Sequence, residues 1–180
     1  MSRLILVRHG PTAASDARAF PADESLTPDG RRAAAGLRGV LPEATTALSS
    51  PALRCLETAA AARLVATVEA GLAECDFGNW AGRTLAEIHS RDPDGVSAWM
   101  TDPTARPHGG ESLVELVNRV AGWLAAVPRD GTTVAITHGG FVRAAIAHAR
   151  GEPPEAVWQI SAEPLSTTEF AWTGDTWQIV

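Results

Sequence analysis

Lysine is absent from this chain of 180 residues, and all 15 of its basic residues are arginines. A phosphate-binding loop of the Walker type requires a lysine, and Schiff-base chemistry, including that of pyridoxal phosphate, requires an amine nucleophile. The sequence therefore excludes both classes of function. Positive charge for binding an anion has to come from arginine.

Cysteine is scarce as well. Cys55 and Cys75 are the only two, and they form no C-x-x-C pair. They are too few for a disulfide framework, which fits a reducing compartment. Neither is followed by an arginine six residues later, so the loop of the thiolate phosphatases is missing. We interpret both as buried, unreactive thiols.

Long apolar runs and basic runs are missing too. No apolar stretch approaches the roughly 20 residues that cross a bilayer, and the first residues lack the pattern of a secretory signal. We therefore expect a cytoplasmic protein with no membrane partner. The net charge of −6, without a basic run, argues against a nucleic-acid partner. A bound anion would lie in a local pocket.

Several catalytic motifs are also absent. There is no G-x-S-x-G elbow of a serine hydrolase, and the five histidines are scattered rather than arranged as H-x-H or H-E-x-x-H. We therefore expect no metal and no cofactor. Asp92–Val96 imitates the D-x-D motif of aspartate-nucleophile phosphatases, but it follows the polar, helix-like stretch Ala86–Arg91 instead of a buried strand. We expect a turn there.

The pattern that is present alternates strands with helices over what we expect to be one domain, residues 1–180. Short apolar runs are typical of buried parallel strands, and two alternating segments around Thr173-Gly174-Asp175 indicate an edge hairpin. This predicts an α/β fold, a three-layer α/β/α sandwich with a mostly parallel sheet and an antiparallel edge hairpin. The expected strands are 3–8, 46–49, 133–137, 168–172 and 176–180.

Helix starts are indicated by capping residues. Thr27-Pro28 and Ser50-Pro51 each combine an N-cap with a proline at the first helical position, and Ser112 forms a capping box with Glu115. A further helix is expected at about 141–150, after the strand that ends at Thr137. We expect the helix after Ser50-Pro51 to run to about Arg63, and loops over 16–24 and 91–108.

Polar side chains follow three of these strands at their carboxyl ends, where ligands bind in open α/β sheets. They are Arg8-His9, the stretch from Ser50 to Arg54, and His138-Gly139. Two arginines, two histidines and helix N-termini at one place are suited to a small dianion such as phosphate. A neutral imidazole directed at phosphorus is a nucleophile, so His9 is the candidate for a phosphohistidine.

Breaking a phosphate ester also needs an acid for the leaving oxygen. Glu74 lies in the stretch LAECDFGNWAG beside the apolar residues Leu72 and Phe77. Asp76 is two residues away, and alternation could direct either carboxyl group inward. We favour Glu74.

The blocks LVRHGPT, LTPDG, SSPALRCLETA, LAECDFGNWAG, GGES and ITHGG resemble the histidine phosphatase superfamily, in the branch with the cofactor-dependent phosphoglycerate mutases. They cover Leu4 to about Arg143 in the family's order. The resemblance implies a phosphoglycerate mutase-like fold and a role for each matching residue. His9 would be the nucleophile and Glu74 the proton donor. The phosphoryl group would be held by Arg8, Arg54 and His138, with Thr12 and the N–H of Gly139 as supporting contacts.

The chain departs from the family pattern just after its first block. Relatives often carry a glutamate where this chain has Pro11, and an asparagine where it has Ser15. The hydroxyl of Ser15 is shorter than an amide, so it is a weaker candidate for a substrate contact. Both departures bear on which substrate is recognised.

Together these features predict a metal-independent phosphatase that hydrolyses a small phosphorylated metabolite through a phosphohistidine. An α-ribazole phosphate-like substrate is suggested by similar length and by the F-G-x-W and G-G-E-S blocks. One alternative is a phosphoglycerate mutase, although the stretch between Glu74 and His138 leaves little room for a closing lid. The other is a non-catalytic module that binds a phosphorylated ligand. The oligomeric state is left open.

Overall fold

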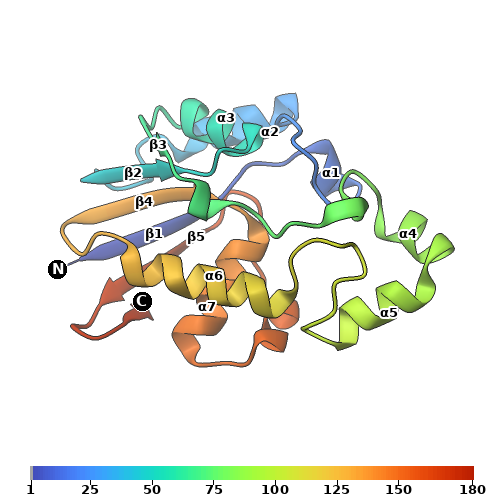
Figure 1. Cartoon of the computed structure of the whole chain (residues 1–180). Helices are drawn as coiled ribbons and strands as arrows, with labels where there is room; N and C mark the ends of the chain where they lie inside the picture. Colours follow the sequence, from blue (N-terminus) through green and yellow to red (C-terminus); the bar gives the residue numbers. More distant parts are fainter. Residues whose placement is uncertain (1) are drawn as a thin grey trace.

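The computed structural model describes residues 2–180 and contains a six-stranded sheet in the order β3-β2-β4-β1-β5-β6 (Figure 1). β1, β2, β3 and β4 run parallel, whereas β5 pairs antiparallel with β1 and with β6. The predicted mixed sheet with its antiparallel edge hairpin is therefore confirmed. The strands are β1 (Arg3–Arg8), β2 (Thr46–Ser49), β3 (Thr67–Val68), β4 (Thr132–Thr137), β5 (Thr167–Trp172) and β6 (Trp177–Ile179).

Helices cover both faces of the sheet, as the predicted three-layer sandwich requires. α2 and α3 lie on one face, and α6 and α7 lie on the other (Figure 1). α1, α4 and α5 lie beyond the carboxyl ends of the parallel strands. The helices are α1 (Ala13–Asp16), α2 (Pro28–Ala34), α3 (Leu53–Ala61), α4 (Leu85–Arg91), α5 (Pro93–Thr101), α6 (Leu113–Ala126) and α7 (Gly139–Arg150).

Alternation along β1 divides the core in two. Leu4 and Leu6 point to the face covered by α6 and α7, while Ile5 and Val7 join the cluster under α3. All four are almost fully buried. Because both faces of the strand are covered, it is a continuous apolar run instead of an alternating one.

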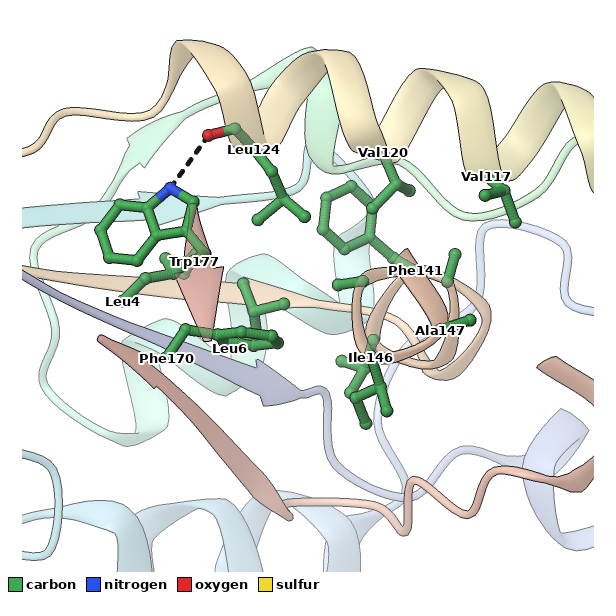
Figure 2. Packing of buried hydrophobic residues seen from close by; sticks show 14 of the residues in the cluster. Leu4, Leu6, Val117, Val120, Leu124, Phe141, Ile146, Ala147, Phe170 and Trp177 are labelled. Carbon is green, nitrogen blue, oxygen red and sulfur yellow. Dashed lines mark hydrogen bonds between the residues drawn. The ribbon is translucent and has the colours of Figure 1, made fainter. Parts of the chain in front are cut away.

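The larger half of the core fills the space between the sheet and helices α6 and α7 (Figure 2). Phe141 and Phe170 are completely buried there. The indole of Trp177 on β6 donates a hydrogen bond of 3.0 Å to the carbonyl of Leu124, which ties the edge hairpin to α6. Burial of each such large side chain stabilises the fold by about 1.5–3 kcal/mol.

Two of the predicted helix starts are confirmed. The hydroxyl of Thr27 accepts a hydrogen bond of 2.9 Å from the N–H of Gly30, with Pro28 at the first position of α2. Ser112 and Glu115 form a reciprocal capping box at the start of α6. Local side-chain chemistry is enough to place these helix ends.

The structure contradicts the expectation of a turn at Asp92–Val96 and of a loop throughout 91–108, because α5 occupies Pro93–Thr101. Asp92 is the N-cap of α5, and its carboxylate accepts a hydrogen bond of 2.9 Å from the N–H of Gly95. Pro93 then occupies the first helical position. The helix is stabilised because Val96 and Trp99 pack into a small separate core with Phe20.

The expected cap at Ser50-Pro51 is also wrong. α3 begins at Leu53, and its N-cap, Ala52, makes no side-chain cap hydrogen bond. The N–H of Leu53 instead donates to the carboxylate of Asp23 at 2.8 Å, while the hydroxyl of Ser50 lies 2.8 Å from a ring nitrogen of His138. The serine is thus engaged with the neighbouring strand end.

Within residues 2–180, no helix has both the length and the apolar character needed to cross a membrane.

Candidate active site

A cavity of about 310 Å³ opens at the carboxyl ends of β1 and β4. Residues of α1 and α5 contribute to its lining. Its inner end contains His9, Arg8 and Glu74, which sequence reasoning places in one site, together with the first turn of α7. Its lining consists of Arg8, His9, Thr12, Ala14, Ser15, Arg18, Ala19, Phe20, Pro21, Glu24, Glu74, Cys75, Phe77, Leu85, Trp99, Leu113, Leu116, Gly139, Gly140, Arg143, Val157 and Trp158.

His9 is held as a neutral ring with a defined tautomer. Its Nδ1 donates to the carbonyl of Gly10 at 2.8 Å, and its Nε2 accepts from Nε of Arg54 at 3.2 Å. The ring is buried, with 6% of its surface exposed. Burial, followed by the proximity of His138 and Arg54, lowers the pKa of His9 to about 3. At neutral pH, Nε2 therefore carries a lone pair and no proton.

Arg54 lies between the two histidines, in the first turn of α3. Its Nη2 donates to Nδ1 of His138 at 3.1 Å, and its Nη1 donates to the carbonyl of Ala22 at 2.7 Å. With Nδ1 accepting, the Nε2–H of His138 donates to the hydroxyl of Ser50. Burial and the charge of Arg54 lower the pKa of His138. The structure thus brings together the three residues that the sequence placed on different strands and helices.

Arg8 and Arg143 form a pair of cations at the inner end of the cavity. A Cβ atom on Gly139 would lie 3.1 Å from Nη2 of Arg143 and 3.2 Å from Nε of Arg8, so both groups surround the same glycine. Among residues 2–180, neither buried Nε atom has a hydrogen-bond partner. Arg8 is anchored by its Nη1, which donates to the carbonyl of Ala162 at 2.5 Å.

The two charges act on each other. Burial lowers the pKa of Arg8 first, and the neighbouring charge of Arg143 lowers it further. Unpartnered buried donors on two cations point to an anion as their common ligand. Sequence reasoning missed Arg143. The only signal was its spacing of four residues from Gly139, which places both on one face of a helix.

Glu74 lies at the N-terminus of α7, after a 3₁₀ turn at Ala70–Leu72. Its carboxylate accepts hydrogen bonds from the N–H of Gly140 at 3.1 Å and from the N–H of Cys75 at 3.0 Å. A side chain at position 140 would displace this carboxylate from its place. Glu74 is therefore fixed against the helix that begins after His138.

Asp76, the alternative acid, faces elsewhere. Its side chain is exposed and accepts a hydrogen bond of 2.8 Å from the N–H of Gly78. It lines a separate open hollow on the outer side of Glu74 and does not line the cavity. Of the two carboxyl groups, only that of Glu74 reaches His9 and Arg8 through a shared cavity.

The segment that carries Glu74 is held by an arginine that the sequence did not single out. Arg119 on α6 donates to the carbonyls of Gly71 and Ala73 at 3.1 Å each, and to that of Glu74 at 3.2 Å. The same guanidinium forms a two-pronged ion pair with Glu111, at 2.7 and 2.9 Å. Nothing in the local sequence indicates this contact, because it joins segments about 45 residues apart.

Thr12 and Ser15 are engaged mainly with each other. They form the capping box of α1: the hydroxyl of Thr12 accepts from the N–H of Ser15, and the hydroxyl of Ser15 accepts from the N–H of Thr12. Thr12 also donates to Glu24 at 3.2 Å, and Ser15 donates to the carbonyl of Thr12 at 2.8 Å. Both residues line the cavity, but their hydroxyl groups already have partners.

Residues 2–180 contain no cluster of three or more His, Cys, Asp or Glu side chains suited to a metal ion. The charged groups at the inner end of the cavity are instead arginines and one carboxylate.

Most of the chain matches a known family. The family model described as histidine phosphatase superfamily (branch 1) matches residues 4–180. Glucosyl-3-phosphoglycerate phosphatase of Mycobacterium tuberculosis is 33% identical over 175 residues, which are 87% of this chain and 78% of that protein. A bifunctional protein of the same organism is 38% identical over 128 residues, 66% of this chain but 35% of that protein. The match thus spans about a third of that relative's length.

The fold has close counterparts among solved structures. The crystal structure of a phosphoserine phosphatase mutant from Entamoeba histolytica in complex with phosphoserine superimposes with a TM-score of 0.89. The superposition covers 99% of this chain and 95% of that one, at 22% identity. The phosphoglycerate mutase-like fold that the sequence blocks implied is confirmed.

Proposed function

The chain belongs to branch 1 of the histidine phosphatase superfamily, and from this premise we propose that it is a phosphomonoesterase that acts on a small phosphorylated metabolite through a phosphohistidine on His9. The strongest support is the state of His9. Its ring is neutral, its Nδ1–H is fixed on Gly10, and its Nε2 lone pair faces Arg54. A lone pair in this position is what attack on phosphorus requires.

In the first step, Nε2 of His9 attacks phosphorus and the bond to the ester oxygen breaks. Arg54 donates to Nε2 in the free enzyme. When a phosphoryl oxygen accepts that hydrogen bond, the lone pair is released for attack. The leaving oxygen takes the proton of Glu74, whose carboxyl group is in its protonated form when this step begins. The products of this step are the free alcohol, a phosphohistidine and the carboxylate of Glu74.

In the second step, water attacks the phosphohistidine. The carboxylate of Glu74 takes a proton from the water, the P–N bond breaks, and inorganic phosphate and neutral His9 are regenerated. Both steps need positive charge around the equatorial oxygens of the phosphoryl group. Arg8, Arg54 and Arg143 supply it, so the proposed mechanism uses no metal.

We predict that Arg143→Met weakens binding of orthovanadate, an analogue of the transferred phosphoryl group, by about 10- to 100-fold. The loss is that of one hydrogen-bonded charge on the anion. Arg143→Lys should recover part of it. Arg150 lies on the same helix but is exposed, so Arg150→Met is the matched control. Unchanged inhibition constants in Arg143→Met would remove this residue from the phosphoryl site.

The volume of the cavity fits a small substrate. About 310 Å³ is at the lower end of the volumes of ligand pockets. The relative named as a glucosyl-3-phosphoglycerate phosphatase supports a phosphorylated metabolite as the substrate class. An α-ribazole phosphate substrate stays a prediction. Among the alternatives, a mutase would need the phosphoryl group to return to a bound product before water reaches it.

A phosphate-release screen over phosphorylated metabolites, with phosphoglycerates included, tests the proposed function. We expect stoichiometric release of inorganic phosphate and an unchanged rate after treatment with EDTA. Isomerisation of phosphoglycerate without phosphate release would identify a mutase. Binding without any turnover would identify a non-catalytic module. Loss of activity with EDTA and recovery with a divalent metal would contradict the mechanism.

A further inference from the structure

The cavity continues outward from the phosphoryl end into a part with apolar walls. We propose that this outer part selects phosphomonoesters whose alcohol carries an apolar, preferably aromatic, group. This inference rests on the proposed function, because it concerns the alcohol released by the same reaction. The apolar side chains of the lining that carry this inference are Phe20, Phe77, Leu85, Trp99, Leu113 and Trp158.

These side chains come from separate parts of the chain and surround the outer cavity from several sides. Phe20 follows α1, Trp99 is on α5, and Leu113 and Leu116 are on α6. Trp158 is on the 3₁₀ segment Pro154–Gln159 after α7. A group extending from the phosphate would therefore meet apolar side chains from several elements.

The outer cavity offers few hydrogen-bond partners to a polar alcohol. Its lining contains no Asn or Gln side chain. The hydroxyl groups of Thr12 and Ser15 are already used in their capping box. Glu24 accepts from Thr12 through Oε1, while its buried Oε2 has no hydrogen-bond partner within residues 2–180 and lies 3.9 Å from Nη1 of Arg54, at the phosphoryl end. A substrate hydroxyl or carboxylate enclosed here would lose its water without equivalent replacement, which is costly.

Charge is concentrated at the inner end. Arg8, Arg143 and Glu74 surround Gly139 and Gly140, where the phosphoryl group is proposed to bind. The remaining cation of the lining is Arg18, whose side chain is exposed. The cavity thus has one charged end, suited to a phosphate, and one apolar end.

The aromatic residues of this wall pack against one another in the absence of a ligand. The ring of Phe20 packs against Phe77, with centroids 4.8 Å apart, and edge-on against Trp99 at 5.4 Å. Trp80, which is buried beneath them, lies 5.2 Å from Phe20 and 5.8 Å from Trp99. A surface fixed by such ring contacts loses little conformational entropy on binding.

The test compares phenylpropyl phosphate with glycerol phosphate. Both are esters of a primary alkyl alcohol, so their leaving groups have similar reactivity and differ mainly in polarity. We expect kcat/KM for phenylpropyl phosphate to be higher by about 10- to 100-fold, the gain from burying one apolar ring. Trp99→Ala and Phe77→Ala should reduce this ratio by at least about fivefold each.

Trp172→Ala is the control, because Trp172 lies on β5, outside the cavity, and should leave the ratio unchanged. Thermal unfolding followed by circular dichroism shows whether each variant is folded. If an alanine variant unfolds, Phe77→Leu and Trp99→Leu keep an apolar side chain and still remove the ring.

Equal kcat/KM values for the two esters overturn the inference. A fall in kcat/KM in the Trp99 and Phe77 variants that is the same for both esters also overturns it. Either outcome leaves a working phosphatase and so leaves the proposed function in place. Absence of turnover with both esters, in a folded protein that also fails the metabolite screen, overturns the proposed function itself. The two failures are therefore distinguishable.

Discussion

His9→Ala is expected to lower kcat by at least about a thousandfold on every ester, activated or not. The variant lacks the only group proposed to form a bond to phosphorus, and removal of a covalent nucleophile leaves only the contribution of binding. The fold should persist, because the ring lies at the end of β1 and not among the apolar residues of the core. Phosphate release measures kcat, and thermal unfolding shows whether the variant is folded.

A trapping experiment isolates the proposed intermediate. Wild-type protein mixed with an ester labelled in its phosphoryl group should retain acid-labile label after rapid quenching, and His9→Ala should retain none. His148→Ala is the control, because His148 is an exposed histidine on α7. Label in His9→Ala, or near-normal turnover by it, would place the nucleophile on another residue.

Parts of the fold that depend on local chemistry could be predicted from the sequence. The buried strand 3–8 and the capping box of Ser112 are determined by residues a few positions apart. The candidate site was also partly predictable, because parallel strands bring their carboxyl ends to one sheet edge. His9, Arg54 and His138 meet there through hydrogen bonds of 3.1–3.2 Å.

The errors occur where a tertiary contact replaces a local one. Ser50 looked like a cap, but His138 engages its hydroxyl group, and Asp23 from a distant segment satisfies the N–H of Leu53 instead. The Asp92-Pro93 sequence is compatible with a turn or a helix start. Its packing against Phe20, more than 70 residues earlier, favours the helix, and no local pattern contains that information.

Arg119 and Arg143 were missed for a related reason. An isolated arginine on a helix is most often a solvated residue, and only the structure shows which segment each one faces. Arg119 holds the backbone on both sides of Glu74, and Arg143 shares Gly139 with Arg8. The residues that Arg119 and Arg143 contact were predicted as members of the site, but the two arginines themselves were not.

Glu74→Gln is expected to separate esters by the basicity of their leaving groups. An alkyl alkoxide is a poor leaving group and needs a proton as the P–O bond breaks, so kcat should fall by about 10²- to 10⁴-fold for phenylpropyl phosphate. Nitrophenolate leaves without protonation, and turnover of nitrophenyl phosphate should fall only severalfold. Glutamine preserves the shape but has one acceptor oxygen, whereas the carboxyl group of Glu74 uses two, Oε1 for the N–H of Cys75 and Oε2 for the N–H of Gly140. Because the loss of one of these hydrogen bonds affects both esters alike, the difference between the esters reports the missing proton.

Asp76→Asn is the matched control for this experiment. Asp76 is two residues away, and asparagine still accepts the hydrogen bond from Gly78. We expect both esters to be hydrolysed within about twofold of the wild-type rate, because surface substitutions away from a site have small effects. If Glu74→Gln slows both esters equally, or if Asp76→Asn shows the larger dependence on the leaving group, the acid is not Glu74. A selective loss in Glu74→Gln alone would mean that the carboxyl group held at the start of α7 donates the proton.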